Sequence, residues 1–230
     1  LPVLSWFILG GQCRYCNASF SFRYAGIEAF FGVYTLAIVM RWDLTIHSLT
    51  CILVGAILVC IALIDHDCWL IDDRMSAGVA VVGLVGHGAS LIVDTGLPWD
   101  ASLVSVATHF AAGLIAFGLL FGMGYVMTKA LDKEALGGGD APLFAAIVCV
   151  TGWAGLLPVL MLTSIQGLLG WAILSRSGGI GNREVEHDDG WQLEEGALPL
   201  GIFLALAGLE VMLIGEGLTD AYLDAVRNLI

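Results

Sequence analysis

Long apolar runs constrain the fold of this chain more than any other feature. Hydrophobic residues make up 58% of the chain and charged residues only 13%, whereas soluble proteins average about 45–50% apolar and about 25% charged residues. The runs cover residues 26–40, 44–64, 76–93, 101–127, 141–150, 156–175 and 198–215. Because about 20 apolar residues in a helix cross a lipid bilayer, we expect an all-α, polytopic membrane helix bundle with about seven transmembrane helices.

The basic residues predict how this bundle is oriented. Lys and Arg near the ends of membrane segments collect on the cytoplasmic side. If alternate connections face the cytoplasm, most of the basic residues lie there, namely Arg14, Arg23, Arg74, Lys129, Lys133, Arg176 and Arg183. Only Arg41 and Arg227 then lie outside. The end of the run 44–64 and the start of the run 141–150 are therefore expected at the cytoplasmic face.

Two aspartates stand at these two cytoplasmic segment ends. Asp65 directly follows an apolar run, and Asp140 directly precedes another. An ionisable group at such a boundary is costly and indicates a function. A pair of carboxyl groups, one protonated and one charged, is the chemical requirement of an aspartic protease. We therefore interpret Asp65 and Asp140 as catalytic, although the sequence does not tell which is the acid and which the base.

Three glycines, Gly137, Gly138 and Gly139, precede Asp140. Because they lack a Cβ, they can adopt turns forbidden to other residues and let an extended peptide pass close to the backbone. Pro142 would then lie in the first turn of the next helix, where its missing N–H costs little. The alternative interpretation of this loop is a simple interhelical turn with no chemistry.

The net charge of −12 excludes nucleic acid as a partner, since binding it needs a basic face. Much of this charge lies in one predicted cytoplasmic loop, residues 177–196, which contains Glu184, Glu186, Asp188, Asp189, Glu194 and Glu195. One interpretation of this acidic loop is a solvated connection. The other is an electrostatic landing site for a basic segment of a substrate.

Cys13 and Cys16 form a CxxC motif in a segment, residues 1–25, that we separate from the transmembrane domain at residues 26–230. This spacing suits two thiolates on one zinc ion, but it supplies only half of a four-ligand site. Two ordinary reduced thiols are the other interpretation. The chain starts at Leu1 without an initiator Met, so we expect position 1 to be the edge of a fragment.

In their order along the chain, five blocks resemble those of the type IV prepilin peptidases, membrane GxGD-type aspartyl proteases that are also N-methyltransferases. The blocks are Leu1–Trp6, Cys13–Asn17 with Arg23, Tyr24 and Glu28, Asp65–Asp73, Glu134–Asp140 and Leu198–Leu204. The resemblance implies that Asp65 and Asp140 are the catalytic pair. It also implies that Asp73 is their structural partner. Two interpretations of Glu134 stay open, support of the site and a solvated charge at the membrane boundary.

The resemblance further implies a bacterial cytoplasmic (inner) membrane protein whose active site faces the cytoplasm. Its substrates would be the prepilins of type IV pili or the pseudopilins of type II secretion, and proteolysis would need no cofactor. S-adenosylmethionine would supply the methyl group for the new N-terminus. The family also implies an upstream CxxC, so that zinc would be bound in the complete protein.

This chain departs from the family pattern beside both aspartates. Asp72 stands where the family usually has Pro, and Pro142 stands where it usually has Lys. Neither change removes a catalytic carboxyl group. A wider GxGD intramembrane protease and a proton-coupled transporter remain alternatives. The transporter predicts inverted repeats and polar residues at mid-span, and the sequence shows no repeat.

Overall fold

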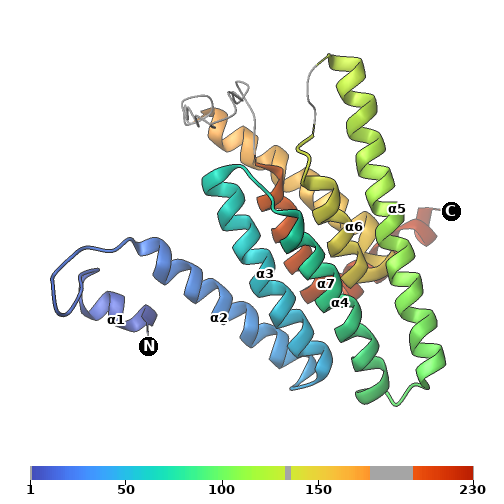
Figure 1. Cartoon of the computed structure of the whole chain (residues 1–230), viewed down its shortest axis with the longest axis horizontal. Helices are drawn as coiled ribbons and strands as arrows, with labels where there is room; N and C mark the ends of the chain where they lie inside the picture. Colours follow the sequence, from blue (N-terminus) through green and yellow to red (C-terminus); the bar gives the residue numbers. More distant parts are fainter. Residues whose placement is uncertain (1, 133–135, 177–198, 230) are drawn as a thin grey trace.

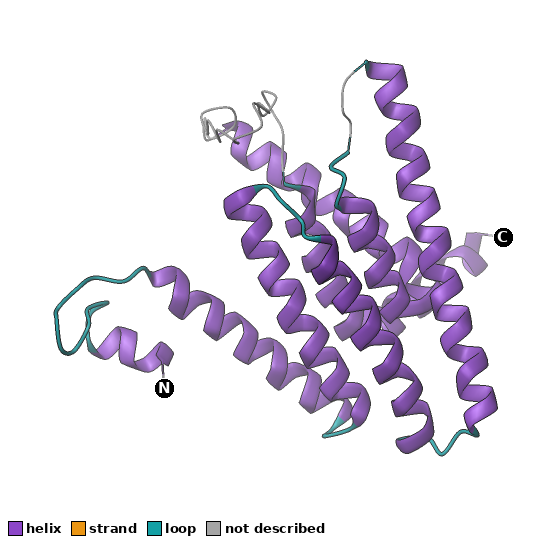
Figure 2. Ribbon diagram, viewed as in Figure 1, coloured by secondary structure: helices purple, strands orange, loops and turns teal. Residues whose placement is uncertain are grey.

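The computed structural model describes residues 2–132, 136–176 and 199–229, and within these ranges it contains helices and no strand (Figure 1). The helices are α1 (Pro2–Ile8), α2 (Phe22–Trp42), α3 (Ile46–Cys68), α4 (Asp73–Val93), α5 (Trp99–Leu131), α6 (Asp140–Arg176) and α7 (Leu200–Leu229). Figure 2 shows the same chain as a helical bundle joined by short loops. The predicted all-α fold is confirmed.

The connections between α2, α3, α4 and α5 are short, so these neighbours run antiparallel. Thr45 caps the start of α3 in a capping box, in which the Thr45 and Ser48 side chains each accept a hydrogen bond from the other residue's backbone N–H. Asp72 begins α4 by accepting a hydrogen bond from the Arg74 N–H at 2.9 Å. Such caps satisfy N–H groups that have no partner inside a helix.

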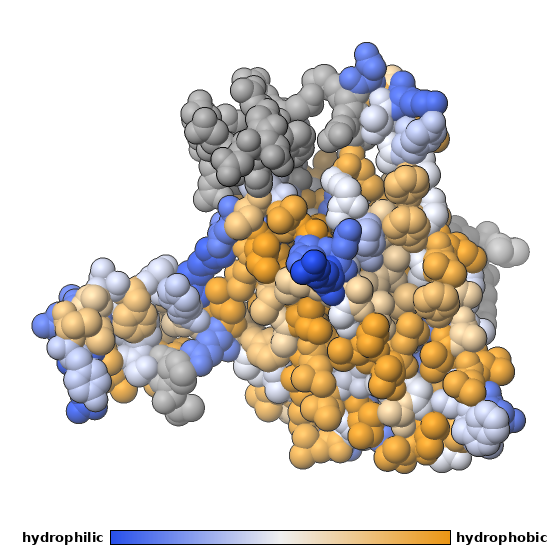
Figure 3. All heavy atoms as spheres, viewed as in Figure 1, coloured by the Kyte–Doolittle hydropathy of each residue, from blue (hydrophilic) through white to orange (hydrophobic). Residues whose placement is uncertain are grey.

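Five helices are long and apolar enough to cross a membrane, namely α2, α3, α4, α5 and the residues 140–173 of α6. Many of their outward side chains are large, apolar and exposed, among them Val33, Val85, Phe121 and Leu168. Figure 3 shows hydrophobic residues over much of this face of the bundle. Such a surface is stable in contact with lipid, and the chain is a multi-pass membrane protein.

The predicted count of about seven transmembrane helices is not confirmed, and α6 shows why. Gly152 interrupts α6 with a φ of 67° and a ψ of −164°, which no helix contains. Figure 1 shows α6 reversing direction, so that the arm after Gly152 returns toward the end of the bundle where α6 begins. The first arm, residues 140–151, rises only about 18 Å and does not span a bilayer. The apolar part of α7, Leu200–Gly215, is also shorter than a full span.

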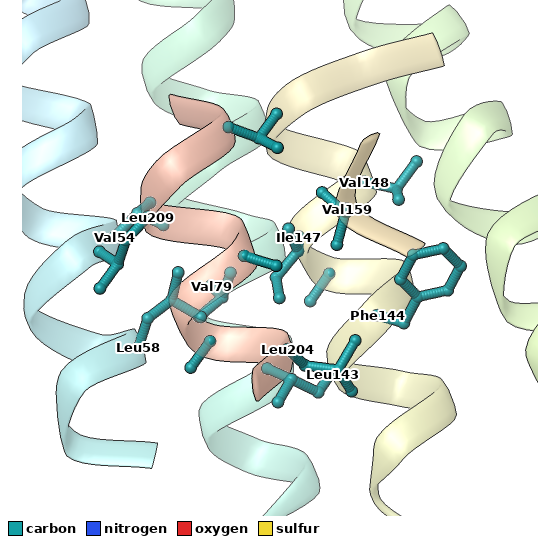
Figure 4. Close-up of a cluster of buried hydrophobic side chains, with 14 of the residues drawn as sticks. Val54, Leu58, Val79, Leu143, Phe144, Ile147, Val148, Val159, Leu204 and Leu209 are labelled. Carbon is teal, nitrogen blue, oxygen red and sulfur yellow. The ribbon is translucent and has the colours of Figure 1, made fainter. Parts of the chain in front are cut away.

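The buried core lies where α3, α4, both arms of α6 and α7 meet (Figure 4). Leu58, Ile147 and Leu204 are almost fully buried there. A Cβ on Gly208 of α7 would lie 3.1 Å from Ile147 and 3.2 Å from Leu58. Small residues at such crossings let helix backbones approach closely, which stabilises helix pairs in lipid. This packing fixes the start of α7 against the end of α3.

The N-terminal segment lies beside the bundle and is joined to it through α2 (Figure 1). Its fold depends on Trp6, whose ring N–H donates to the Phe20 carbonyl at 3.2 Å. A single bridge between Gln12 and Ser19 brings the two sides of the CxxC loop together.

Candidate active site

Asp65 lies in the last turn of α3, and its side chain is 5% exposed. The Ile202 N–H, from the first turn of α7, donates to Asp65 Oδ2 at 3.2 Å. The first N–H groups of a helix lack partners inside that helix and carry a partial positive charge. The start of α7 therefore supplies a donor to a carboxyl group that would otherwise lie at the unfavourable C-terminal end of α3.

Asp140 is the first residue of α6, and its side chain is also 5% exposed. The Gly137 N–H donates to Asp140 Oδ2 at 3.0 Å, and the Asp140 N–H donates to the Gly137 carbonyl at 3.2 Å. This tight loop thus orients the carboxyl group through its own backbone. Pro142 lies in the first turn of α6, as the sequence predicts.

Ile71 lies between the two aspartates, in the connection from α3 to α4. A Cβ on Gly139 would lie 2.6 Å from Ile71 Cβ. A Cβ on Gly201 would lie 2.6 Å from Ile71 Cδ1 and 2.7 Å from Asp65 Oδ2. Ile71 therefore packs against both the glycine that precedes Asp140 and the glycine that precedes Ile202, the donor to Asp65. The fold thus brings together two residues that are 75 positions apart in sequence (140 − 65).

The glycines of the GGGD loop differ from one another. None of the three has a positive φ, so the expected need for turns forbidden to other residues is wrong. Two of them instead leave room for neighbouring side chains. A Cβ on Gly137 would lie 2.9 Å from Asp140 Oδ2, and a Cβ on Gly139 would clash with Ile71. Gly138 faces open space.

Asp73, the expected structural partner, makes no hydrogen bond to Asp65 or Asp140 within the described part of the chain. Asp73 is exposed in the first turn of α4 and lines a separate cavity of about 240 Å³ together with Pro142. Asp72 caps α4, which gives the position usually held by Pro a structural task. Glu134 and the acidic loop 177–196 lie outside the described residues.

Sequence reasoning missed Ile71, Gly201 and Ile202 as parts of this site. Gly201 and Ile202 belong to the Leu198–Leu204 block that carries the family resemblance, and that was the available signal. Ile71 gave no signal of its own, because an apolar residue between two helices has many possible neighbours.

The CxxC segment presents two thiols on one turn. The Cys13 N–H donates to the Ala18 carbonyl at 2.9 Å, and the Asn17 N–H donates to the Cys13 carbonyl at 3.0 Å. The backbone N–H groups of Tyr15 and Cys16 lower the pKa of the Cys13 thiol below its ordinary value, which favours the thiolate that binds metal. In the described part of the chain, no group of three or more possible metal ligands occurs. The donors therefore fit half of a zinc site.

Two family models match this chain, one over the N-terminal segment and one over the helical bundle. A model described as "Type IV leader peptidase family" matches residues 52–172, and one described as "Bacterial Peptidase A24 N-terminal domain" matches residues 1–42. The first match contains Asp65 and Asp140, and the second contains the CxxC segment.

Three relatives named "Prepilin leader peptidase/N-methyltransferase" match along nearly the whole chain. The protein from Legionella pneumophila is 29% identical over 97% of this chain and 70% of its own length. Those from Myxococcus xanthus and Aeromonas salmonicida are both 30% identical, over 97% and 98% of this chain and 67% and 70% of their own lengths. No solved structure matches the chain.

Proposed function

We propose that this chain, which belongs to the type IV leader peptidase family, cleaves its substrates with Asp65 and Asp140 as the catalytic pair. The family is one of membrane proteases, and its members remove the leader peptide from type IV prepilins. The observation that carries the proposal is that two almost fully buried carboxyl groups, at the end of α3 and the start of α6, lie beside glycines that both pack against Ile71. The family match also favours a peptidase over the transporter alternative.

The geometry suits acid–base hydrolysis. Each carboxyl group has one oxygen, Oδ2, that accepts a backbone N–H, from Ile202 for Asp65 and from Gly137 for Asp140. In the proposed reaction, the other oxygen of each carboxyl group would contact the water or the substrate. One carboxyl group must be ionised and one protonated, because two carboxyl groups that share a site do not both ionise readily.

In the proposed reaction, the ionised carboxylate takes a proton from a water molecule, whose oxygen then attacks the scissile carbonyl carbon. The protonated carboxyl group donates a hydrogen bond to the oxyanion that develops. Breaking the C–N bond transfers a proton to the leaving amine, and the products are a peptide acid and a new N-terminus. The two aspartates share these roles as a pair.

The positive residues support a cytoplasmic position for this site. Arg74 and Arg176 lie at the ends of helices on the side of the bundle where both aspartates lie, and Lys129 lies in the last turn of α5. Basic residues collect on the cytoplasmic side of membrane proteins. We place the prepilin leader, or that of a pseudopilin, at this face.

Two further features are proposed from the relatives. Their shared name includes N-methyltransferase activity, so we propose that S-adenosylmethionine methylates the new N-terminus. Cys13 and Cys16 would contribute two of four ligands to a zinc ion that stabilises the N-terminal segment.

The test is cleavage of a prepilin in detergent by the wild type, Asp65→Asn and Asp140→Asn. Both variants should lose at least about 100-fold in cleavage rate, because each removes a group that transfers a proton. Asp100→Asn is the matched control, since Asp100 lies in the first turn of α5 at the opposite end of the bundle. Cleavage by folded Asp65→Asn or Asp140→Asn at the wild-type rate would disprove the dyad.

A further inference from the structure

A groove with a volume of about 450 Å³ lies between α2, α3 and α7. Each of the three helices contributes four residues at the spacing i, i+3, i+4 and i+7, as Ile202, Ala205, Leu206 and Leu209 do in α7. This spacing means that each helix turns one stripe toward the groove. The stripes extend for about 10 Å, or two helical turns.

The groove is polar at one end only. Arg23 and His66 lie at the end near Asp65, and the other lining residues are apolar or glycine. Arg23 also pairs with Asp67 at 2.8 Å across the mouth between α2 and α3. An occupant would therefore meet charged groups where it enters and hydrophobic side chains along the rest of its length.

This groove adjoins Asp65 at its polar end. Ile202 lines it with its side chain, while its backbone N–H donates to Asp65 Oδ2 at 3.2 Å. His66 lines it and directly follows Asp65. A peptide bond held at the aspartates thus lies at the polar end of the groove, and the rest of that peptide can continue into the apolar part.

The walls and surroundings favour a helix as the occupant. Gly26, Ala62 and Ala205 place small residues on all three walls, which allows another helix to approach closely. The groove lies along the membrane-spanning part of α2 and α3. Within lipid a peptide must satisfy its own backbone hydrogen bonds, which a helix does and an extended strand does not.

From these observations we propose that the α2–α3–α7 groove binds an apolar helical segment of the substrate that adjoins the scissile bond and remains in the membrane. This proposal rests on the proposed function of the aspartate pair. It assigns substrate recognition to helix-in-groove packing at residues other than the two proposed catalytic aspartates. The acidic loop 177–196 of the chain itself is an unsuitable occupant, because its charges would be buried against apolar walls.

The first test is photo-crosslinking with the full chain carrying Asp140→Asn, so that a bound prepilin is not cut. A benzophenone amino acid replaces Phe30, which lines the groove and is 45% exposed, or Phe121, which is 59% exposed on α5 and lies outside the groove. We expect the Phe30 position to crosslink the apolar segment of the prepilin at least ten times more than the Phe121 position. Equal crosslinking, or crosslinks from Phe30 only to lipid, to the same chain or to a second copy, would overturn the proposal.

The second test fills the groove. A Cβ on Gly26 meets only Phe22, at 3.8 Å, so Gly26→Leu places its side chain into the groove without a clash at its base. Gly32→Leu on the same helix is the matched control, because a Cβ there meets nothing within 4 Å and Gly32 does not line the groove.

Each variant is assayed with a prepilin that keeps its apolar segment and with a short peptide that covers only the scissile bond. For Gly26→Leu, we expect kcat/KM for the prepilin to fall about tenfold more than kcat/KM for the short peptide. Gly32→Leu should change neither. An equal loss on both substrates, or no loss, would overturn the groove proposal, whereas a wild type that cuts neither substrate would instead overturn the proposed function.

Discussion

The two aspartates are held in place by different means. Asp140 receives its hydrogen bond from Gly137, three residues earlier in the same loop. Asp65 receives its hydrogen bond from Ile202, which is 137 residues later and lies in the first turn of α7. One carboxyl group is therefore positioned by local backbone geometry, and the other by the packing of α7 against α3. The difference predicts that substitutions far from Asp65 in sequence disturb it more than substitutions next to Asp140 disturb Asp140.

The largest effect should follow from Gly201→Val, which tests whether the packing of α7 against α3 positions Asp65. A side chain here would push against Asp65 Oδ2 and Ile71 Cδ1, which lie 2.7 and 2.6 Å from a Cβ at this position. Because a displacement of about 1 Å in a catalytic group can cost about 100-fold, we expect kcat/KM for prepilin cleavage to fall by about that factor.

The control for Gly201→Val is Gly167→Val in α6, whose Cβ would meet only Phe203 at 3.9 Å. It should keep activity within about threefold, since ordinary contacts rarely cost more than a fraction of a kcal/mol on a surface. Wild-type activity in Gly201→Val would show that the start of α7 does not position Asp65.

A smaller effect should follow from Gly137→Ala, which tests whether the backbone of the GGGD loop positions Asp140. The added Cβ would lie 2.9 Å from Asp140 Oδ2, so the loop must shift by a few tenths of an ångström. We expect about a tenfold loss in kcat/KM. Gly138→Ala in the same motif should have no effect, because nothing lies within 4 Å of its Cβ. Equal effects of the two alanines would contradict a role for space at Gly137.

The smallest effect should follow from Asp72→Ala, which removes the cap of α4 next to Ile71. Loss of an N-cap lowers the free energy of unfolding by about 1 kcal/mol. We expect a lower thermal midpoint in detergent and prepilin cleavage within about twofold of the wild type. Asp72→Asn, which still accepts the Arg74 N–H, should keep both. A loss of cleavage without a loss of stability would move Asp72 from a structural to a catalytic role.

This contrast also explains what the sequence could predict. The apolar runs predicted the helical membrane bundle, because each run is a local signal. The GGGD motif marked Asp140 for the same reason. The partner of Asp65 could not be read, because Ile202 is an apolar residue whose backbone N–H becomes important only when α7 packs on α3. The reversal at Gly152 was also hidden, since two apolar runs separated by glycine are equally consistent with two full spans.

The reversal at Gly152 bears on how the protein enters the membrane. A segment of twelve residues, 140–151, is too short to be laid across a bilayer by itself. It must enter together with the arm that follows, as a hairpin whose two ends stay on the side from which they came. We therefore expect Asp140 to reach its buried position only after the second arm has been synthesised, so that membrane insertion of both arms precedes assembly of the proposed catalytic pair.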